Sequence, residues 1–437
     1  MLSSRLPKDL SPSPFFAELE RAKASAKPFI DMTVSSPVKA GLPIDLDAAV
    51  EETRKDFGCW NPDAAGWKSA REAVVEYYRE RGGNFTAGQI ILTASTSEAY
   101  SVLFKTFCDP GDVILTPMPG YPLLDTLAQL EHLECAPYFL KLQREKKKKI
   151  PAGACPEQVE WAGMTSGVDI RFILDSDSLL AAPEKAKILL LVSPHNPTGH
   201  CISREEWNEA VRFCEESHLI LVVDEVFGDY AFMDKVKRTW EYVLGECHPE
   251  RNEVKSKDLW DAGGGDFINL PEDGPKCPIF WLNGLSKAVG SPQLKLGWMA
   301  FYAPRERFEE IRAALEFVED AYLSVSAPAQ ALGTALLKQS VAYESRVKER
   351  LLKNWQTLRE SFPAKYCPEV LGGWYAVIRL GEDDEELTLR LLREKHVLVQ
   401  PGFFFDFDED GWVVVSLLQE PALFKDAVAR MRSLADS

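Results

Sequence analysis

Several polar residues in this sequence stand close behind apolar runs, and their types suit chemistry on a carbonyl compound. Lys287 follows the run 278–282. A lysine held beside apolar and aromatic side chains has a lowered pKa, which makes its amine a nucleophile toward carbonyl carbon. For any single lysine, a solvent-exposed position is the more common explanation. Lys287 is therefore a candidate that needs partners elsewhere in the chain.

An acidic and an amide side chain follow two further apolar runs. Asp224 comes directly after 219–223. A carboxylate there is costly to bury unless a cation, such as a protonated ring nitrogen, lies beside it, although it could also reach solvent. Asn196 stands between Pro194 and Pro197. Because prolines restrict the backbone, this amide suits one aimed hydrogen bond, unless the segment is a plain turn.

A candidate anion site follows the run 89–93. Ser95 and Thr96 stand at the predicted start of a helix. Free backbone N–H groups and the helix dipole favour an anion there, although an ordinary N-cap would account for the same residues. Together, an anion site, an aimed amide, a buried carboxylate and a desolvated lysine match the needs of a pyridine aldehyde bearing a phosphate and a phenolic oxygen.

These side chains must be positioned by a sheet whose strands are the apolar runs. Short apolar runs alternate with helical patterns, which predicts a largely parallel sheet with helices on both faces. Ligands of such sheets bind beyond the carboxyl ends of the strands. The predicted fold is α/β, with a large domain built on a mostly parallel, helix-covered, seven-stranded sheet and a smaller α+β domain. The predicted strands of the sheet include 89–93, 112–116, 186–192, 219–223, 278–282 and 298–302, and the predicted helices between them include 97–107, 123–132 and 204–217.

Three parts are predicted along the chain. Residues 1–45 are an N-terminal arm that packs with the small domain, 46–304 form the large domain, and 305–437 form the small domain. Two segments are interpreted as insertions, and the Gly263–Gly265 run in the second is interpreted as a connector. The insertions are 143–167 and 234–275; helices are predicted at 305–321, 327–361 and 421–434, and small-domain strands at 373–380, 397–400 and 412–417.

Composition excludes several classes of protein. The formal net charge of −17 disfavours a nucleic-acid partner. No run approaches the ~20 apolar residues that a membrane span needs, and the N-terminus has no apolar core of a secretory signal. Nine scattered cysteines indicate reduced thiols, and six His residues without a HxxxH pair give no support for a metal. We therefore expect a cytoplasmic protein without a metal, membrane or nucleic-acid partner.

The motifs around the candidate residues resemble those of fold-type I aminotransferases of class I and II. The resemblance covers most of the chain and implies a pyridoxal 5'-phosphate enzyme that forms a homodimer. Its landmarks, in order, are WNPDAAG (60–66), TASTSEA (93–99), DPGD (109–112), PMPGYP (117–122), SPHNPTG (193–199), VVDEVFGDY (222–230), GLSKAVGSPQLKLGW (284–298) and GGW (372–374).

The resemblance also implies roles for individual residues. Lys287 resembles the lysine that forms the Schiff base with the cofactor and moves the proton between Cα and C4′. Asp224 matches the partner of the pyridinium nitrogen, Asn196 matches the donor to O3′, and Tyr121 matches the ring that stacks on the cofactor. The residues that match phosphate-binding segments are Ser95, Thr96 and Ser286.

Four positions depart from the family pattern around the cofactor. Phe227 replaces a Tyr that donates to O3′, so we expect the lysine–cofactor bond to keep its proton to higher pH than in a Tyr-bearing relative. Lys295 replaces a phosphate-binding Arg. The lysine keeps the positive charge but cannot donate the paired hydrogen bonds of a guanidinium group. Gly284 stands where a phosphate-binding Ser is common, and Trp60 replaces a Tyr that crosses the dimer interface to the neighbour's phosphate.

The arginine that grips the substrate α-carboxylate is missing, because Val414 stands at its expected position. Arg379 is the nearest alternative on a predicted strand. It lies about 20 Å beyond Gly373 at ~3.3 Å per residue, which is too far along the strand. Lys39, in the arm, is the better candidate for the carboxylate.

The function predicted from these features is transamination between an amino acid and a 2-oxo acid. Lys287 acts as the general base, and Asp224 keeps the cofactor ring nitrogen protonated. Two alternatives remain: a β-lyase reaction on the same cofactor, and a cofactor-binding domain without catalysis that serves as a sensor or scaffold. The residues around the cofactor do not identify the amino acid.

Overall fold

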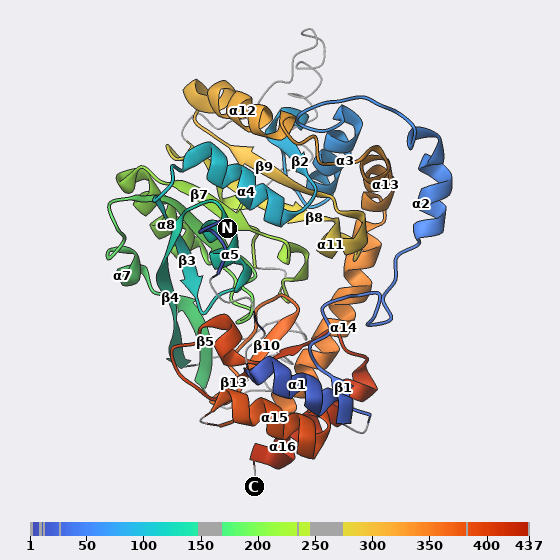
Figure 1. Cartoon of the computed structure of the whole chain (residues 1–437), viewed down its shortest axis with the longest axis vertical. Helices are drawn as coiled ribbons and strands as arrows, with labels where there is room; N and C mark the ends of the chain where they lie inside the picture. The colour runs from blue at the N-terminus through green and yellow to red at the C-terminus, as the bar shows by residue number, and fades with distance from the viewer. Residues whose placement is uncertain are drawn as a thin grey trace, which may run out of the picture.

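This computed structural model describes residues 3–7, 11, 14–25, 28–146, 168–233, 236–244, 274–381 and 383–435. Among these residues, a mixed sheet of eight strands forms the centre of the larger part of the molecule (Figure 1). The strands are parallel from β8 to β4, while β9 runs antiparallel to both its neighbours and β5 runs antiparallel to β4. In spatial order the strands are β2 (Ile90–Thr93), β9 (Gly297–Tyr302), β8 (Ile279–Gly284), β7 (Ile220–Asp224), β6 (Ala186–Val192), β3 (Val113–Met118), β4 (Glu134–Lys146) and β5 (Val168–Leu174).

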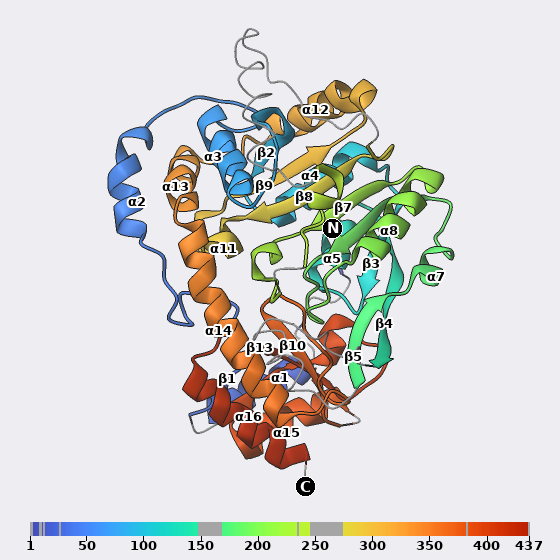
Figure 2. The ribbon, with the colours of Figure 1, turned by 180° about the vertical axis from the view of Figure 1, so that it is seen from behind.

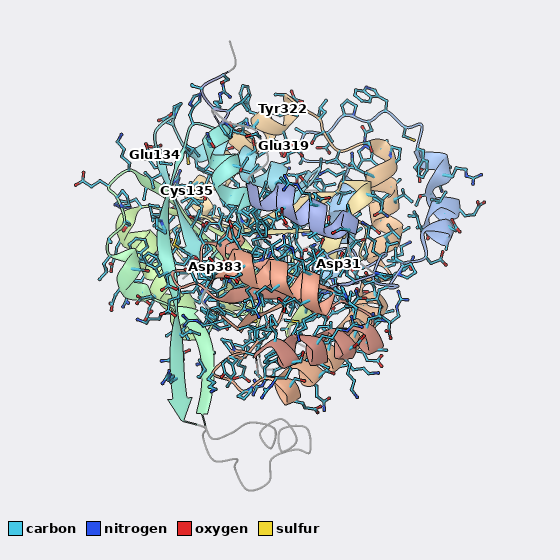
Figure 3. The ribbon with its side chains drawn as sticks, turned by 60° about the horizontal axis from the view of Figure 1, so that its bottom comes forward. Asp31, Glu134, Cys135, Glu319, Tyr322 and Asp383 are labelled. Atoms are coloured by element: carbon cyan, nitrogen blue, oxygen red, sulfur yellow. The ribbon has the colours of Figure 1, made fainter. Side chains whose placement is uncertain are left out.

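The α/β prediction is confirmed, but the predicted number of seven strands is wrong. The central strands β6 and β7 are almost continuously apolar and buried, as expected for a parallel sheet covered on both faces. The long β4 and β5 pair antiparallel over 140–146 and 168–174, and of these residues only 143–146 fall within the predicted insertion 143–167. Figure 3 shows this pair projecting from the body of the molecule.

Helices cover both faces of the large sheet (Figures 1 and 2). One apolar core joins the sheet to α4, α5 and α12, and the other joins it to α3, α8 and α13. α8 shows how the sequence sets such a helix: Ser203 and Glu206 form a capping box at its start, and His218 ends it in a left-handed conformation. These helices are α3 (Lys68–Arg79), α4 (Thr96–Phe107), α5 (Leu123–Leu130), α8 (Arg204–Ser217), α12 (Arg305–Asp320) and α13 (Ala327–Leu337).

The smaller part packs helices on two small sheets and includes the N-terminal arm. β10 and β12 each pair antiparallel with β13, and β1 of the arm pairs parallel with β11. Their buried side chains form a further apolar core with α14 and α16. The elements are α1 (Pro14–Ser25), β1 (Ile30–Asp31), α14 (Ser340–Ser361), β10 (Tyr375–Arg379), α15 (Asp384–Lys395), β11 (Val397–Leu398), β12 (Gln400–Pro401), β13 (Trp412–Ser416) and α16 (Pro421–Ala435).

The structure differs from the sequence prediction in the segment after residue 305. The helix predicted over 327–361 is two helices, α13 and α14, separated by Lys338 and Gln339. In addition, α12 and α13 pack in the cores of the large sheet, because their apolar faces meet α4 and α3. The chain passes to the small domain along α14, whose Asn354 donates hydrogen bonds to the carbonyls of Leu417 and Gln419 (2.8 and 2.7 Å).

Most of both predicted insertions, including Gly263–Gly265, lies outside the described residues. Within the part of the chain that is described, no helix has the length and apolarity needed to cross a membrane. The same residues contain no cluster of three His, Cys, Asp or Glu side chains that could hold a metal. The remaining short helices are α2 (Leu46–Thr53), η1 (Arg54–Asp56), η2 (Ala87–Gln89), α7 (Ser176–Leu179), η3 (Gly228–Tyr230), α9 (Glu241–Leu244), α11 (Leu285–Ala288), η4 (Pro292–Leu294) and η5 (Gly402–Phe405).

Candidate active site

The carboxyl ends of β2, β3, β6, β7 and β8 meet at one edge of the large sheet, because these strands run in the same direction. The segments that the sequence singled out follow these ends. Along that edge, Asp224 is in register with Val192 on one side and Leu282 on the other. The topology therefore gathers into one region the lysine, the carboxylate, the amide and the start of α4.

Lys287 extends from the four-residue helix α11, directly after β8. Its Nζ lies 4.6 Å from the ring centroid of Trp374 and 5.3 Å from that of Phe227. Burial lowers the pKa of Lys287 to about 8, and the charge of Asp224 opposes that shift. A substantial fraction of this amine is thus neutral and nucleophilic near physiological pH.

Asp224 is held by neutral donors. The phenol of Tyr100, on α4, donates to its Oδ2 at 2.6 Å, and the backbone N–H of Val226 donates to its Oδ1 at 3.0 Å. Burial raises the pKa of Asp224, while these hydrogen bonds and the charge of Lys287 lower it. No described Lys, Arg or His forms an ion pair with this carboxylate. Lys287 is the cation whose charge acts on Asp224, and because no ion pair is formed, the carboxylate can still bind a cation such as a protonated ring nitrogen.

Asn196 and Tyr121 lie in loops after β6 and β3. The Oδ1 of Asn196 is buried and has no hydrogen-bond partner among the described residues. The ring of Tyr121 is about half exposed, and its pKa is raised by burial and then by the charge of Asp224, which indicates that the two side chains are neighbours. Both side chains are available to a planar ligand above the sheet edge.

The start of α4 and the start of α11 form the candidate anion site. Ser95 caps α4 by accepting the N–H of Glu98 at 3.2 Å, and Thr96 and Ser286 are half-buried. Gly297 lies beneath this turn: a Cβ on it would come within 3.0 Å of the Ser95 carbonyl carbon. A Cβ on Gly284 would come within 3.0 Å of the Gly297 Cα, which explains why a serine does not fit at 284. The anion must therefore be bound by the backbone and by the remaining hydroxyls.

Three predicted residues are not brought into contact with this cluster within the described single chain. Lys295 is exposed in a left-handed conformation, and Lys39 is exposed on a turn of the arm; neither forms an ion pair in the described part of the chain. Trp60 is 81% exposed and lines a pocket of about 50 Å³ with Glu319 and Leu323.

The strand that lacks the arginine presents an apolar surface. Val414 is fully buried in β13 between Val377 and Gln400. Arg379 pairs with Glu409 and lies over the ring of Trp412 at 5.8 Å, so its charge is engaged away from Lys287.

Sequence reasoning missed three residues that touch the cluster: Tyr100, Trp374 and Tyr230. Tyr100 binds Asp224 across a separation of 124 residues, which no local pattern reveals. The phenol of Tyr230 donates to the Lys287 carbonyl. Trp374 follows the Gly372–Gly373 landmark, and this position was the only signal that could have identified it.

Comparison with known proteins decides the family. Residues 45–430 match the family model described as aminotransferase class I and II. The chain belongs to this family. Members of the family use pyridoxal phosphate, and the chain is a pyridoxal-phosphate-dependent aminotransferase. The resemblance inferred from the motifs is confirmed.

Relatives with assigned activities are distant but span most of the aminotransferase. The glutamate-pyruvate aminotransferase of Haemophilus influenzae is 22% identical, over 97% of this chain and 95% of the relative. The alanine aminotransferase of Mycobacterium tuberculosis (strain H37Rv) is 26% identical, over 79% and 71% respectively. The solved structure of an alanine aminotransferase from Pyrococcus furiosus has a TM-score of 0.76 at 21% identity and covers all of both chains, which shows a shared fold.

The residues of this aminotransferase fit pyridoxal phosphate. Asp224 is a desolvated carboxylate that forms no ion pair among the described residues, and Asn196, whose Oδ1 is held by no described hydrogen bond, carries an Nδ2 that can donate to a ring oxygen. Asp224 would hold the protonated ring nitrogen, Asn196 the ring oxygen, Tyr121 the ring face, and the start of α4 the phosphate. When bound, the cofactor supplies an electron sink for the carbanion that forms as the amino acid loses its α-proton.

Proposed function

We propose that Lys287 would hold the cofactor through its aldehyde and would act as the general base for the α-proton of the amino acid. The observation that carries this proposal is the half-buried amine of Lys287 at the strand edge, with its pKa lowered to about 8 by burial and Asp224 as the facing charge. Asp224 keeps a proton at the ring nitrogen, and Tyr100 fixes the direction of that carboxylate.

The α-carboxylate of the substrate is held, in this proposal, by Lys39 in place of the missing arginine. The arm supports this role, because Pro37 lies beside Gly290: a Cβ on Gly290 would be 3.2 Å from the Pro37 Cβ. Lys39 is two residues from Pro37, has an exposed side chain and has no ion-pair partner among the described residues. A lysine on a flexible stem supplies a point charge without the planar fork of arginine.

A half-reaction screen tests the function. Purified enzyme loaded with pyridoxal phosphate is mixed with single amino acids, and the fall of its absorbance near 430 nm (an approximate cofactor band) is followed. We expect alanine, glutamate or tyrosine, the substrates named for the relatives, to convert the cofactor to its amine form without release of ammonia. Release of ammonia with pyruvate would instead indicate the β-lyase reaction. Absence of any conversion would indicate a domain without catalysis.

The same screen tests Lys39. Lys39→Met is expected to raise KM for the amino acid about tenfold with little change in kcat, because the lost charge binds substrate and transition state alike. Lys55→Met, on a neighbouring exposed lysine, is the control. Equal KM values for the two variants would exclude Lys39 as the carboxylate ligand.

We further propose a cytoplasmic homodimer, with Trp60 reaching toward the partner's phosphate site and Lys295 binding the phosphate of its own subunit. Exposed apolar side chains support an interface: Trp60 and Phe317 are each 81% exposed, and Tyr322 is 57% exposed. Leu323 lines the pocket beside Trp60, and Figure 3 shows Tyr322 next to Glu319, another residue of this pocket. Monomeric proteins rarely expose several large apolar side chains together.

Light scattering tests the assembly. We expect a mass twice the 49.0 kDa of the chain at micromolar concentration, and a shift toward the single-chain mass when Trp60 and Tyr322 are both replaced by alanine. Leu180→Ala, at another exposed apolar residue, is the control for general loss of apolar surface. A single-chain mass for the unaltered enzyme would contradict the homodimer.

A further inference from the structure

Tyr230 makes a hydrogen bond directly to the backbone of the reactive lysine. It ends the short helix η3, which follows Asp224 along the chain, and its phenol donates to the Lys287 carbonyl at 2.6 Å. The side chain is fully buried, and its ring lies 5.2 Å from that of Trp374, which also contacts the Lys287 amine. This bond ties the segment after β7 to the segment after β8.

Asp229, the residue before Tyr230, is the centre of a buried charge network. Its carboxylate accepts hydrogen bonds from the phenol of Tyr77 (2.8 Å), Nε of Arg81 (2.9 Å) and Nη2 of Arg238 (2.6 Å). Burial raises the pKa of Asp229, but the two guanidinium groups outweigh it and bring that pKa to about 2. The Asp229 carboxylate therefore stays ionised at neutral pH.

The network also reaches α14 and the end of β8, the strand that precedes Lys287. Arg81 also donates to Glu344 (2.9 Å) and to Ser340 (3.4 Å), both in the first turns of α14. The Tyr77 phenol accepts a hydrogen bond from Nδ2 of Asn283 at 3.0 Å, and Asn283 is at the end of β8. Through Asp229, the segment carrying Tyr230 is thus fixed to α3, α14 and β8.

Such a network is poorly explained by stability alone. Several charges withdrawn from water cost desolvation, and apolar side chains of similar volume often stabilise a fold as well or better. Directional hydrogen bonds, in contrast, hold the groups that they join in a single arrangement. Here the joined groups are the two strand ends that carry Asp224 and Lys287.

We propose that Tyr230, held in place by the Asp229 network, is a positioning residue for Lys287. The hydrogen bond fixes the peptide unit from which the lysine extends, and so fixes the direction in which the amine meets the reacting carbon. Phe227 has no hydroxyl and so cannot orient Lys287 by a hydrogen bond. In the segment after β7, Tyr230 is the residue whose phenol does so. The inference rests on the proposed role of Lys287 and extends it.

The variant Tyr230→Phe tests the inference, because it removes one hydroxyl and keeps the buried ring. Tyr138→Phe is the matched control: Tyr138 is also buried, and its phenol donates to the Leu190 carbonyl at 2.9 Å, away from Lys287. Three quantities are measured for both: the unfolding temperature, kcat and KM in transamination, and the rate at which cofactor-free protein bonds added pyridoxal phosphate, followed by absorbance.

We expect both variants to lose similar thermal stability, since each loses one phenol–carbonyl hydrogen bond. Only Tyr230→Phe should bond the cofactor about tenfold more slowly and lose about tenfold in kcat with KM within twofold, because misorientation affects the reacting geometry rather than substrate binding. Asp229→Asn should reproduce the slower bonding. Equal rates for Tyr230→Phe and Tyr138→Phe would overturn the inference.

A fourth variant separates this inference from the function on which it rests. Lys287→Ala should bond no cofactor covalently. If Lys287→Ala bonds no cofactor and Tyr230→Phe behaves as the unaltered enzyme, only the positioning role fails. If Lys287→Ala still bonds the cofactor, the role of Lys287 fails as well.

Discussion

Replacement of Lys287 by alanine is expected to lower kcat by about 10⁴-fold or more. The variant lacks both the nucleophile that bonds the aldehyde and the base that moves the α-proton, and general-base catalysis alone contributes about 10²–10⁴-fold. Initial rates of 2-oxo acid formation measure the loss, and absorbance of the purified protein shows whether the cofactor is bonded.

Lys338→Ala is the control for this variant. Lys338 is exposed and pairs with Glu52, so its replacement should leave kcat unchanged. In the unaltered protein, the rate of cofactor bonding should rise with pH through about 8, because burial lowers the pKa of Lys287 to about 8 and only the neutral amine reacts. Activity of Lys287→Ala within tenfold of the unaltered enzyme would exclude Lys287 as the reactive residue.

Asp224→Asn is expected to lower kcat by about 10²–10³-fold and, at the same time, to stabilise the cofactor-free protein. The amide cannot hold a proton at the ring nitrogen, and loss of one preorganised electrostatic contact typically has an effect of about this size. In the cofactor-free protein, however, Asp224 forms no ion pair among the described residues, and burial raises its pKa although the charge of Lys287 opposes that shift.

The raised pKa of Asp224 determines whether Asp224→Asn stabilises or destabilises the cofactor-free protein. A carboxyl group whose pKa is higher in the folded than in the unfolded state destabilises the fold above its unfolded pKa, and this cost disappears as pH falls. The unfolding temperature of cofactor-free Asp224→Asn should therefore exceed that of the unaltered protein at neutral pH, and the difference should shrink as the solution is acidified. Thermal unfolding followed by circular dichroism measures both.

The neighbouring carboxylate provides a matched control. Glu225 is also buried, and its Oε1 accepts the backbone N–H of Thr239 at 2.7 Å. Glu225→Gln should change kcat far less than Asp224→Asn does. Equal losses of kcat in the two variants would show that a buried carboxylate at this place serves the fold and not the cofactor.

The part of the site on the large sheet could be predicted because its geometry is encoded locally. Continuous apolar runs indicated parallel strands, and parallel strands bring their carboxyl ends to one edge. Asp224, Asn196 and Lys287 therefore had to lie near one another once the strands were recognised. The same logic predicted that the start of α4, at Ser95, lies at this edge.

What could not be predicted depends on contacts between distant segments. The Tyr100–Asp224 bond, the Tyr230–Lys287 bond and the contact of Trp374 with Lys287 each join separate elements, and nothing in the local pattern encodes them. Neither β4 nor β5 was among the predicted strand ranges, because both border the polar segment 143–167 that was interpreted as an insertion. The break between α13 and α14 was missed because Lys338 and Gln339 are both good helix formers.

The single helix α14 has a mechanical consequence. Its 22 residues span about 33 Å at 1.5 Å per residue. Ser340 at one end is tied to the large sheet through Arg81, and Asn354 further along is tied to the carbonyls after β13. The helix therefore connects the two parts as one rigid element, and the break before Ser340 is the point about which it could rotate. A rotation of about 5° there would move the far end by about 3 Å, and with it the chain after β13 to which Asn354 is bonded.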